Sequence, residues 1–515
     1  MTGAALPSRT LFKGATLLTL DGPAGFVAQK GDLAVDGARI AEIADCIVPL
    51  PGDRVIEAGS SLIMPGLVNA HTHSSETFFR GRYERMPLEV WLLYAYPLLM
   101  DDPIAPRLLY LRALLLAMES LRNGVTTLSD DFFDPPGHDL DRLLTTVQAY
   151  EDAGIRATVS SAVMNIPTLD ALPYARTLMP ASLQAELDVG TPIGTVDYLA
   201  FCRAAVDAFH GRAGRLNFMV APSAPQRCTP DLIIACHDFA RAHDLPFHTH
   251  VLETKVQAVT GPTLYGQSLI AYMAELGVLS SHTAIAHAVW VDDDDMRLMG
   301  EAGCSVAHNA ISNLRLGSGV APIRRMLDAG INVALGTDGL SSNDTARVFD
   351  LMRVAALVQS VPGPDPADWL SAAEVLEAAT LGGARAARLG DVVGSLKVGK
   401  AADLIMLDLT NDPFVPLNDP VKHLVYAENG SSIELIMVAG EIVVRNGRLT
   451  RFDEAAVKAE LAALLPAYLA GHAKVEARNR VFEPYFAEIH RRAARVDLGL
   501  DRYAGDRRAE RHTPK

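Results

Sequence analysis

A repeating pattern of apolar and amphipathic segments extends from about residue 62 to residue 359 of the chain. Each unit is a short, β-branched apolar run, then a loop, then an amphipathic stretch of roughly ten or more residues. Two helix signals support this: the stretch 107–122 ends before Asn123-Gly124, and the stretch 231–243 begins after Thr229-Pro230. The apolar runs lie at 62–69, 125–128, 155–160, 216–221, 245–250, 283–288, 304–307 and 332–336. Eight such units without a hairpin signal predict an α/β fold, a closed (β/α)8 TIM barrel.

The segments on either side of this pattern have a different texture. Residues 10–56 and 401–449 contain short alternating strands with glycines at the expected turns. Because each flank is too short to fold well alone, we expect residues 1–61 and 391–452 to form one small β-sandwich domain together. The barrel then occupies residues 62–390. Residues 453–515 are predicted to form a helical C-terminal extension whose last part is rich in arginine.

Composition and charge exclude several classes of protein. The chain has 515 residues, of which 49% are hydrophobic and 21% charged, as in a globular protein with a large core. Its 46 Lys and Arg against 61 Asp and Glu give a net charge of −15, so nucleic acid is not an expected partner. We find no secretory signal and no apolar stretch that could span a membrane. Five cysteines without a C-x-x-C pair favour a reducing compartment, so we expect a cytoplasmic protein.

Histidines and one aspartate occur where the predicted barrel strands end. His71 and His73 follow the first run with the i, i+2 spacing that places both imidazoles on one face of a strand. His250 ends the fifth run, His287 lies near the end of the sixth, and Asp338 follows the eighth. Barrel enzymes build their active sites at these ends, and imidazole plus carboxylate suits zinc or a similar divalent ion. Taken singly, each of these residues also has an ordinary structural explanation in a loop or turn.

Acid–base groups are needed beside such a metal. An open coordination position would bind water and make hydroxide available near neutral pH. Attack on carbon also needs groups that move protons to and from the reactants. Glu253, three residues after His250, is a candidate for this role, although the spacing also fits a solvated residue at a helix start.

Several strings in the chain resemble the amidohydrolase superfamily, in the branch of cytosine, guanine and S-adenosylhomocysteine deaminases and s-triazine chlorohydrolases. The matching strings are Met64-Pro65-Gly66-Leu67-Val68-Asn69-Ala70-His71-Thr72-His73, His250 to Thr254, Ala286-His287-Ala288, Val306 to Asn309 with Ser312 to Arg315, Gly336-Thr337-Asp338 and Gly394 to Leu404. They occur in the family's order and cover nearly everything up to about Leu449.

The resemblance implies one divalent metal ion per chain, with zinc preferred and iron or manganese left open. It implies that His71, His73, His250 and Asp338 bind the metal. Asp338 would also accept the proton of the water, Glu253 would move protons and His287 would polarise water or substrate. The implied reaction is the hydrolytic release of ammonia from an amino-substituted ring, and the substrate is a small molecule. A homodimer or larger homo-oligomer is also expected.

Two alternatives stay open at this point. The same residues could displace chloride or an amine from a ring, amide, urea or carbamate. A catalytically inactive metal-binding scaffold is a further alternative, which the complete set of site residues disfavours.

Two positions differ from those of the family members that act on nucleosides, and these differences indicate the substrate class. Leu99 stands near the position of their ribose-binding glutamate, and Ser223 stands where they have a histidine after Ala-Pro. These departures favour a free base, pterin or triazine-like ring without ribose. We expect His248 to line the pocket. The candidate substrate-binding residues are Glu76, Trp91, Tyr94, Gln226, His308 and Asn309.

Overall fold

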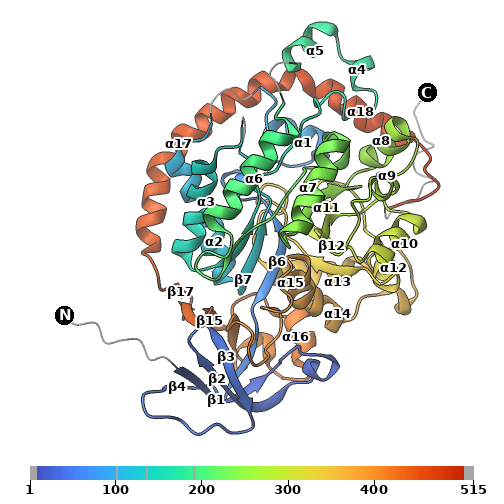
Figure 1. Cartoon of the computed structure of the whole chain (residues 1–515). Helices are drawn as coiled ribbons and strands as arrows, with labels where there is room; N and C mark the ends of the chain where they lie inside the picture. Colours follow the sequence, from blue (N-terminus) through green and yellow to red (C-terminus); the bar gives the residue numbers. More distant parts are fainter. Residues whose placement is uncertain (1–8, 100–102, 135–136, 189–191, 504–515) are drawn as a thin grey trace.

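The computed structural model describes residues 9–99, 103–134, 137–188 and 192–503. Residues 1–8 and 504–515 of the expected flanking segments lie outside the described residues. The fold is α/β, with parallel strands at the centre and helices around them (Figure 1). Among the described residues, none of the helices has the length and apolar character needed to cross a membrane.

Eight parallel strands form two four-stranded sheets. The first sheet consists of β6 (Leu67–Thr72), β7 (Val125–Asp130), β8 (Arg156–Val159) and β9 (Leu216–Phe218), and the second of β10 (Phe247–Val251), β11 (Thr283–His287), β12 (Ser305–His308) and β13 (Asn332–Leu335). A parallel bridge between Val220 and Phe247 connects the two sheets after β9. On the other side, the Asp338 amide donates to the His71 carbonyl at 2.9 Å. Each strand lies within or overlaps one of the eight apolar runs.

The first apolar run is divided between two sheets. Residues Ser61–Pro65 form β5, which pairs with strands of the flanks, and β6 begins only at Leu67. Gly66 separates them, and a Cβ there would lie 2.1 Å from Oγ1 of Thr126. The chain therefore passes from one sheet to the other where only glycine fits.

Helices lie between the strands and around them in Figure 1. They are α1 (Leu88–Ala95), α2 (Pro106–Arg122), α3 (Leu140–Ala153), α4 (Ala175–Leu178), α5 (Ala181–Leu187), α6 (Thr195–Phe209), α7 (Pro230–Ala242), α8 (Lys255–Tyr265), α9 (Leu269–Glu275), α10 (Asp293–Ala302), α11 (Ala310–Arg315), α12 (Ile323–Asp328), α13 (Val348–Val358), α14 (Ala372–Glu377), α15 (Gly383–Ala386) and α16 (Pro420–Tyr426). Short 3-10 helices are η1 (Pro23–Phe26), η2 (Ser74–Phe79), η3 (Pro225–Arg227), η4 (Pro366–Asp368), η6 (Asp412–Phe414) and η7 (Arg480–Phe482), and η5 (Ala378–Gly382) is a π-helix. The two helices that the sequence predicts most clearly are α2 and α7, and each begins with proline in its first turn.

Strands from both flanks form one continuous nine-stranded sheet, in place of the expected sandwich. They are β1 (Arg9–Leu17), β2 (Gln29–Asp36), β3 (Arg39–Ala44), β4 (Arg54–Glu57), β5, β14 (Leu404–Asp408), β15 (Ile433–Val438), β16 (Glu441–Arg445) and β17 (Arg448–Leu449). β5 pairs with β1 on one side and with β14 on the other, which joins the two flanks. Apolar side chains of both flanks, such as Phe12 and Leu404, share one buried cluster.

The C-terminal extension consists of α17 (Glu454–Asn479) and α18 (Glu483–Arg495), which follow the outside of the molecule in Figure 1. α17 packs on α1 and α2, and α18 packs on α1 and α8. Arg82, in the loop before α1, donates two hydrogen bonds to Glu476 at 2.7 and 2.8 Å. The extension is thus bound to the loop that joins η2, which contains Glu76, to α1, which contains Trp91 and Tyr94.

Candidate active site and metal centre

The candidate metal ligands converge at the carboxyl ends of the parallel strands. His71 belongs to β6 and His250 to β10. His73 directly follows β6, and Asp338 lies three residues after the end of β13. The ligand atoms of His71, His73 and Asp338 lie within 4.8 Å of one another. A cavity of about 90 Å³ lies beside them, lined by His73, His250 and Asp338 among others. The structure therefore brings together residues that are up to 267 positions apart, as Asp338 is from His71.

The orientation of two imidazoles is fixed by backbone carbonyls. Nδ1 of His73 donates to the Asp131 carbonyl at 2.7 Å, and Nδ1 of His250 donates to the Ser223 carbonyl at 2.9 Å. Their Nε2 atoms consequently point at each other across 3.3 Å. Oδ1 of Asp338 lies 3.3 Å from Nε2 of His73. Such outer hydrogen bonds are the usual means by which proteins hold metal-binding histidines in one tautomer.

His71 has an unsatisfied nitrogen that faces the same point. Its Nδ1 lies 2.8 Å from Nε2 of His248, whereas its own Nε2 is buried without a hydrogen-bond partner among the described residues. Burial lowers the pKa of His71 to about 4, so this nitrogen keeps its lone pair at neutral pH. Three imidazoles and a carboxylate directed at one point fit a divalent cation with nitrogen and oxygen ligands.

Asp338 is held as a carboxylate. Ser312 Oγ donates to Oδ2 at 2.5 Å, and the Gly339 amide donates to Oδ1 at 2.9 Å. Burial disfavours the charge, but His71, whose Nε2 lies 3.5 Å from Oδ1, and the other neighbouring imidazoles hold the pKa of Asp338 well below the usual range. Its φ of +63° is rare for a residue with a side chain. The strained backbone at the strand end is what turns this carboxylate toward the histidines.

Glu253 is a buried carboxyl group in the same cavity. Its side chain lines the cavity, and only 3% of the residue is exposed. Burial raises its pKa well above the usual value, and the charges of Asp338 and Glu89 act in the same direction. Burial therefore favours the protonated form of Glu253, which can donate a proton. The backbone amide of Glu253 donates to Oε1 of Gln257 at 3.0 Å, which fixes the start of α8.

His287 faces Glu253 across the cavity, with 3.7 Å between Nε2 and Oε2. Nδ1 of His287 donates to Oδ1 of Asn313 at 2.9 Å, and Nδ2 of Asn309 lies 3.3 Å from each ring nitrogen. Burial lowers the pKa of His287, which keeps the imidazole neutral. The ring can therefore accept a proton or a hydrogen bond at Nε2.

Glu76 and Trp91, two of the candidate substrate-binding residues, line the same cavity. Glu76 accepts from Tyr96 Oη at 2.9 Å and from Ser341 Oγ at 2.7 Å. Burial raises the pKa of Glu76 to about 7. Asn309 lies beside His287 and contacts its ring nitrogens, so it acts on the site through that imidazole.

Tyr94 and His308 do not reach the cavity beside the metal ligands, contrary to expectation. The Tyr94 hydroxyl donates to Glu483 of α18, because this residue lies on the face of α1 that packs against the extension. His308 lines a separate cavity under α12 and α14. The next residue back, Ala307, pairs in register with Ala286, which pairs with His250, so alternation along β12 turns His308 to the other face of the sheet.

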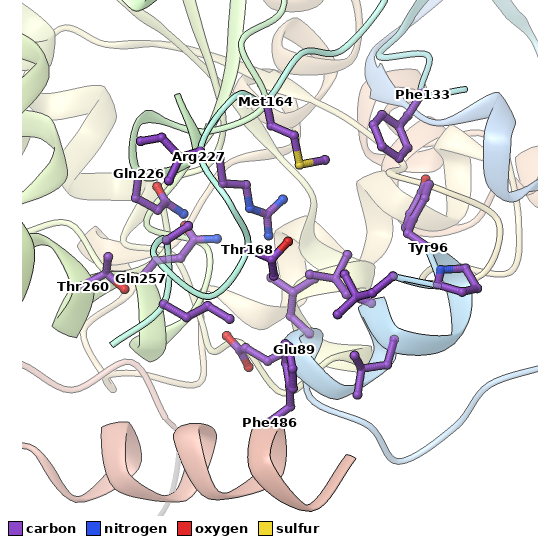
Figure 2. Close-up of a pocket in the computed structure, with 18 residues that line it drawn as sticks. Glu89, Tyr96, Phe133, Met164, Thr168, Gln226, Arg227, Gln257, Thr260 and Phe486 are labelled. Atoms are coloured by element: carbon purple, nitrogen blue, oxygen red, sulfur yellow. The ribbon is translucent and has the colours of Figure 1, made fainter. Parts of the chain in front are cut away.

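A second, larger cavity adjoins the first and is shown in Figure 2. Its volume is about 220 Å³, and we call it the outer chamber. Gln226, also expected in the pocket, lines the outer chamber and not the inner cavity. Residues that line both cavities are Leu88, Leu92, Tyr96, Phe133, Met164, Arg227 and Gln257. The inner cavity therefore opens into a space mostly surrounded by apolar side chains.

Sequence reasoning missed Asp131, Tyr96 and Arg227. Asp131 follows β7, and its Oδ2 lies 3.7 Å from Nδ1 of His250. Its place directly after an apolar run was the same signal that identified His71 and Asp338. Tyr96 directly follows α1 and Arg227 ends the short helix η3, and the apolar pattern does not encode the direction of these segments.

Comparisons with known proteins agree with this arrangement. A 5'-deoxyadenosine deaminase of Methanosarcina mazei is 33% identical over 446 residues, covering 86% of this chain and 94% of that protein. A 5-methylthioadenosine/S-adenosylhomocysteine deaminase of Nitratidesulfovibrio vulgaris strain DP4 is 35% identical over 452 residues, covering 87% and 94%.

Solved structures give the same result. Atrazine chlorohydrolase TrzN from Arthrobacter aurescens TC1, complexed with zinc, matches with a TM-score of 0.80 and 28% identity over 89% of this chain and 100% of that chain. An adenosine deaminase from Xanthomonas campestris with bound zinc matches with a TM-score of 0.75 and 27% identity, over 92% and 98%. Residues 62–443 match the model of the amidohydrolase family. This chain belongs to the amidohydrolase family.

Proposed function

We propose that this chain is a metal-dependent hydrolytic deaminase that releases ammonia from an amino-substituted nitrogen heterocycle. The observation that carries the proposal is the cluster of His71, His73 and Asp338, with Nε2 of His250 3.3 Å from Nε2 of His73, beside the buried acid Glu253. Two relatives at 33% and 35% identity are named as deaminases of adenine-containing compounds, which supports a purine-like ring as the first substrate class to test. That the ring is free of ribose remains a prediction from Leu99 and Ser223.

The proposal also covers closure of the barrel, the domain boundaries, the oligomeric state and the cellular location. The bridge at Val220 and the hydrogen bond from Asp338 to His71 support closure of the eight strands into a (β/α)8 barrel. We propose residues 62–390 as the catalytic domain and residues 1–61 with 391–452 as a composite β domain. We further propose a homodimer or larger homo-oligomer, on the family resemblance. All five cysteines are unpaired, which supports a cytoplasmic location.

Zinc is the metal we propose, one ion per chain. Three imidazole nitrogens and one carboxylate oxygen are ligands that zinc accepts, and two structural neighbours are described with zinc. When bound, the ion would supply the Lewis acidity that makes water a nucleophile near neutral pH. His71, His73, His250 and Asp338 would hold it.

The protein's own groups then move the protons. Asp338, which is ionised, accepts a proton from the attacking water. Glu253, which burial keeps protonated, donates to a ring nitrogen as water adds to the neighbouring carbon. His287, held neutral and oriented by Asn313, hydrogen bonds to the attacking oxygen through Nε2. Asp338 passes the proton taken from water to the amino nitrogen, the carbon–nitrogen bond breaks and ammonia leaves. The hydroxyl proton of the adduct returns to Glu253 as the ring carbonyl forms, so both acids regain their starting states.

A second candidate function has one specific observation in its favour. The similarity to atrazine chlorohydrolase TrzN supports displacement of chloride, or of an amine, by the same machinery. The two reactions share water activation and differ in the group that leaves.

Product analysis separates these candidates. Zinc-reconstituted protein is incubated with aminated purines, pyrimidines, pterins and triazines, each as the free base and, for adenine, as the 5'-deoxynucleoside, with chlorinated and ureido analogues in parallel. We expect ammonia and the oxygenated ring from at least one amino compound, and no release by Glu253→Gln. Chloride or amine release without any ammonia would instead support the second candidate. No turnover of any compound by fully metallated protein would support an inactive scaffold.

A further inference from the structure

The outer chamber combines an apolar surface with a single arginine at its entrance to the metal site. Apolar side chains such as Leu172 and Phe486 form much of its wall, and Phe486 comes from α18 of the C-terminal extension (Figure 2). Arg227 lines both this chamber and the inner cavity. A substrate that reaches the metal site therefore passes or contacts the guanidinium.

The backbone of Arg227 is fixed on both sides. Arg227 is the last residue of η3, and its amide donates to the Ala224 carbonyl at 2.9 Å. Its carbonyl accepts from the amides of Asn165 and Ile166, each at 3.1 Å. This preorganisation reduces the entropy that a ligand must overcome to order the side chain.

The guanidinium itself lacks a counterion within the described part of the chain. Its one hydrogen bond there is a long contact of 3.4 Å from Nη1 to Ser223 Oγ, and no carboxylate oxygen of the described residues lies within 4.0 Å. By contrast, the buried Arg156 pairs with Asp403 through two hydrogen bonds of 2.8 and 3.0 Å. Arg227 is partly exposed where it lines the cavities. A ligand that displaces water from the guanidinium must supply a partner for its charge, because an unpaired charge removed from water is costly.

The two nearest acids do not supply that partner. Burial lowers the pKa of Arg227, and Glu253 and Glu89 act on it in the opposite direction at longer range. Oε2 of Glu253 instead lies 3.7 Å from Nε2 of His287. One oxygen of Glu89 accepts from Thr254 Oγ1 at 2.6 Å, and the other lies 3.4 Å from Nδ1 of His490 on α18. Both acids are thus engaged elsewhere.

Ser223 connects Arg227 to the metal site. Its carbonyl oxygen accepts from Nδ1 of the ligand His250 at 2.9 Å, and its hydroxyl contacts the Arg227 guanidinium. The guanidinium is consequently linked to the proposed metal ligand His250 through a single residue, Ser223. It lies at the side of the inner cavity where we place the reacting ring. Guanidinium groups donate in pairs to carbonyl and carboxylate oxygens.

We propose that Arg227 is a specificity-determining residue that binds an sp² oxygen of the substrate, so that the preferred substrates are amino heterocycles carrying a ring carbonyl or an adjacent carboxylate. The inference rests on the proposed deaminase function and narrows its substrate class. Substituents beyond the ring extend into the outer chamber, where apolar groups fit best against Phe486 and Leu172.

Matched substrate pairs test this directly. Cytosine and 4-aminopyrimidine differ by a ring carbonyl, as do isoguanine and adenine. In a third pair, 9-carboxymethyladenine and 9-ethyladenine differ by a carboxylate. Ammonia release gives kcat and KM for zinc-loaded wild type, Arg227→Gln, Arg227→Lys and the control Arg203→Gln, which alters an exposed arginine on α6.

For the oxygen-bearing member of at least one pair, we expect Arg227→Gln to lower kcat/KM by roughly 10- to 100-fold, mainly through KM. The partner that lacks the oxygen should change little, Arg227→Lys should retain part of the preference, and Arg203→Gln should resemble wild type. The pair that shows the effect identifies whether the oxygen belongs to the ring or to a carboxylate. Equal loss for both members of every pair would overturn the proposal, as would an unchanged preference.

A binding measurement separates this inference from the proposed function. Calorimetry with zinc-loaded Glu253→Gln and Glu253→Gln/Arg227→Gln measures Kd for the same pairs without turnover. If wild type releases no ammonia from any compound, the deaminase function fails, and the Kd values still decide the role of Arg227. Failure of every oxygen-bearing compound to bind more tightly than its partner would overturn the inference even if ammonia is released.

Discussion

Oε2 of Glu253 lies 3.7 Å from Nε2 of His287, and both side chains are buried beside the candidate metal ligands. Burial keeps the first protonated and the second neutral. An acid and an acceptor thus face each other without a full charge on either. This is the arrangement that a reaction needs when one atom of the substrate gains a proton and water loses one.

Replacing Glu253 with glutamine should remove the acid while preserving the shape of the site. We expect turnover to fall by roughly 10²- to 10⁴-fold with metal content unchanged, because glutamine cannot donate a proton to the ring. Steady-state kinetics together with metal analysis check this. Turnover equal to wild type would remove Glu253 from the mechanism.

The pH dependence should follow the protonation of Glu253. Since burial raises its pKa well above the usual value for a carboxyl, the acid form persists to higher pH than in a free glutamate and is lost as pH rises through the raised pKa. We therefore expect kcat/KM to decline as pH rises through that pKa. A kcat/KM that rises steadily with pH over that range would show that Glu253 acts as an ionised base.

Metal binding should depend on His71 and not on His308. Both histidines are buried, but only His71 faces the other ligands, whereas His308 lies on the opposite face of the sheet. After equilibration with limiting zinc, His71→Ala should hold far less than one ion per chain, and His308→Ala should hold the same amount as wild type. Full occupancy in His71→Ala would contradict the proposed ligand set.

The clustering of the candidate metal ligands could be predicted from the sequence because strand ends converge. His71, His250 and Asp338 each follow a short apolar run, and parallel strands bring such positions to one edge. Tyr94 and His308 were wrong for reasons that sequence alone does not contain. Tyr94 lies on the face of α1 that a distant helix, α18, covers, and the orientation of His308 depends on the register of β12 with β11.

For His287, strand alternation alone would have predicted the wrong side-chain direction. In β11 it follows Ala286, which shares a face with His250, so alternation would turn His287 away from the site. A φ of +74° at His287 reverses that direction. The family motif pointed to His287, which lines the cavity, whereas strand periodicity would have placed its side chain outside.

The buried pair Arg156 and Asp403 should stabilise the contact between the parallel strands and the nine-stranded sheet. Arg156 belongs to β8, and Asp403 directly precedes β14. Asp403→Asn leaves a buried guanidinium without a counterion, so we expect a loss of about 3–5 kcal/mol in the free energy of unfolding. The exposed pair Arg297 and Glu301 is the control, and Glu301→Gln should cost less than about 1 kcal/mol. Chemical denaturation measures both, and equal effects would contradict the account.

Asp295 should make stability depend on pH far from the active site. Burial raises its pKa to about 6, so its contribution is present below the unfolded-state value and is lost as pH rises through about 6. Asp295→Asn does not titrate. As pH falls from about 7 to about 5, wild type should gain about 1 kcal/mol of stability relative to Asp295→Asn. Denaturation curves measure the stability of both proteins at each pH. A stability difference between wild type and Asp295→Asn that does not change with pH would show that the pKa of Asp295 is not raised.

The central claim is that water replaces an amino group on a ring at this metal site. Its most direct test is turnover of the best amino heterocycle by zinc-loaded protein in oxygen-18 water, with ammonia quantified and the product examined by mass spectrometry. The account predicts one ammonia released for each oxygen-18 atom incorporated into the ring product, and neither in His71→Ala. Ammonia without labelled oxygen, or product formation that does not depend on the metal ligands, would contradict it.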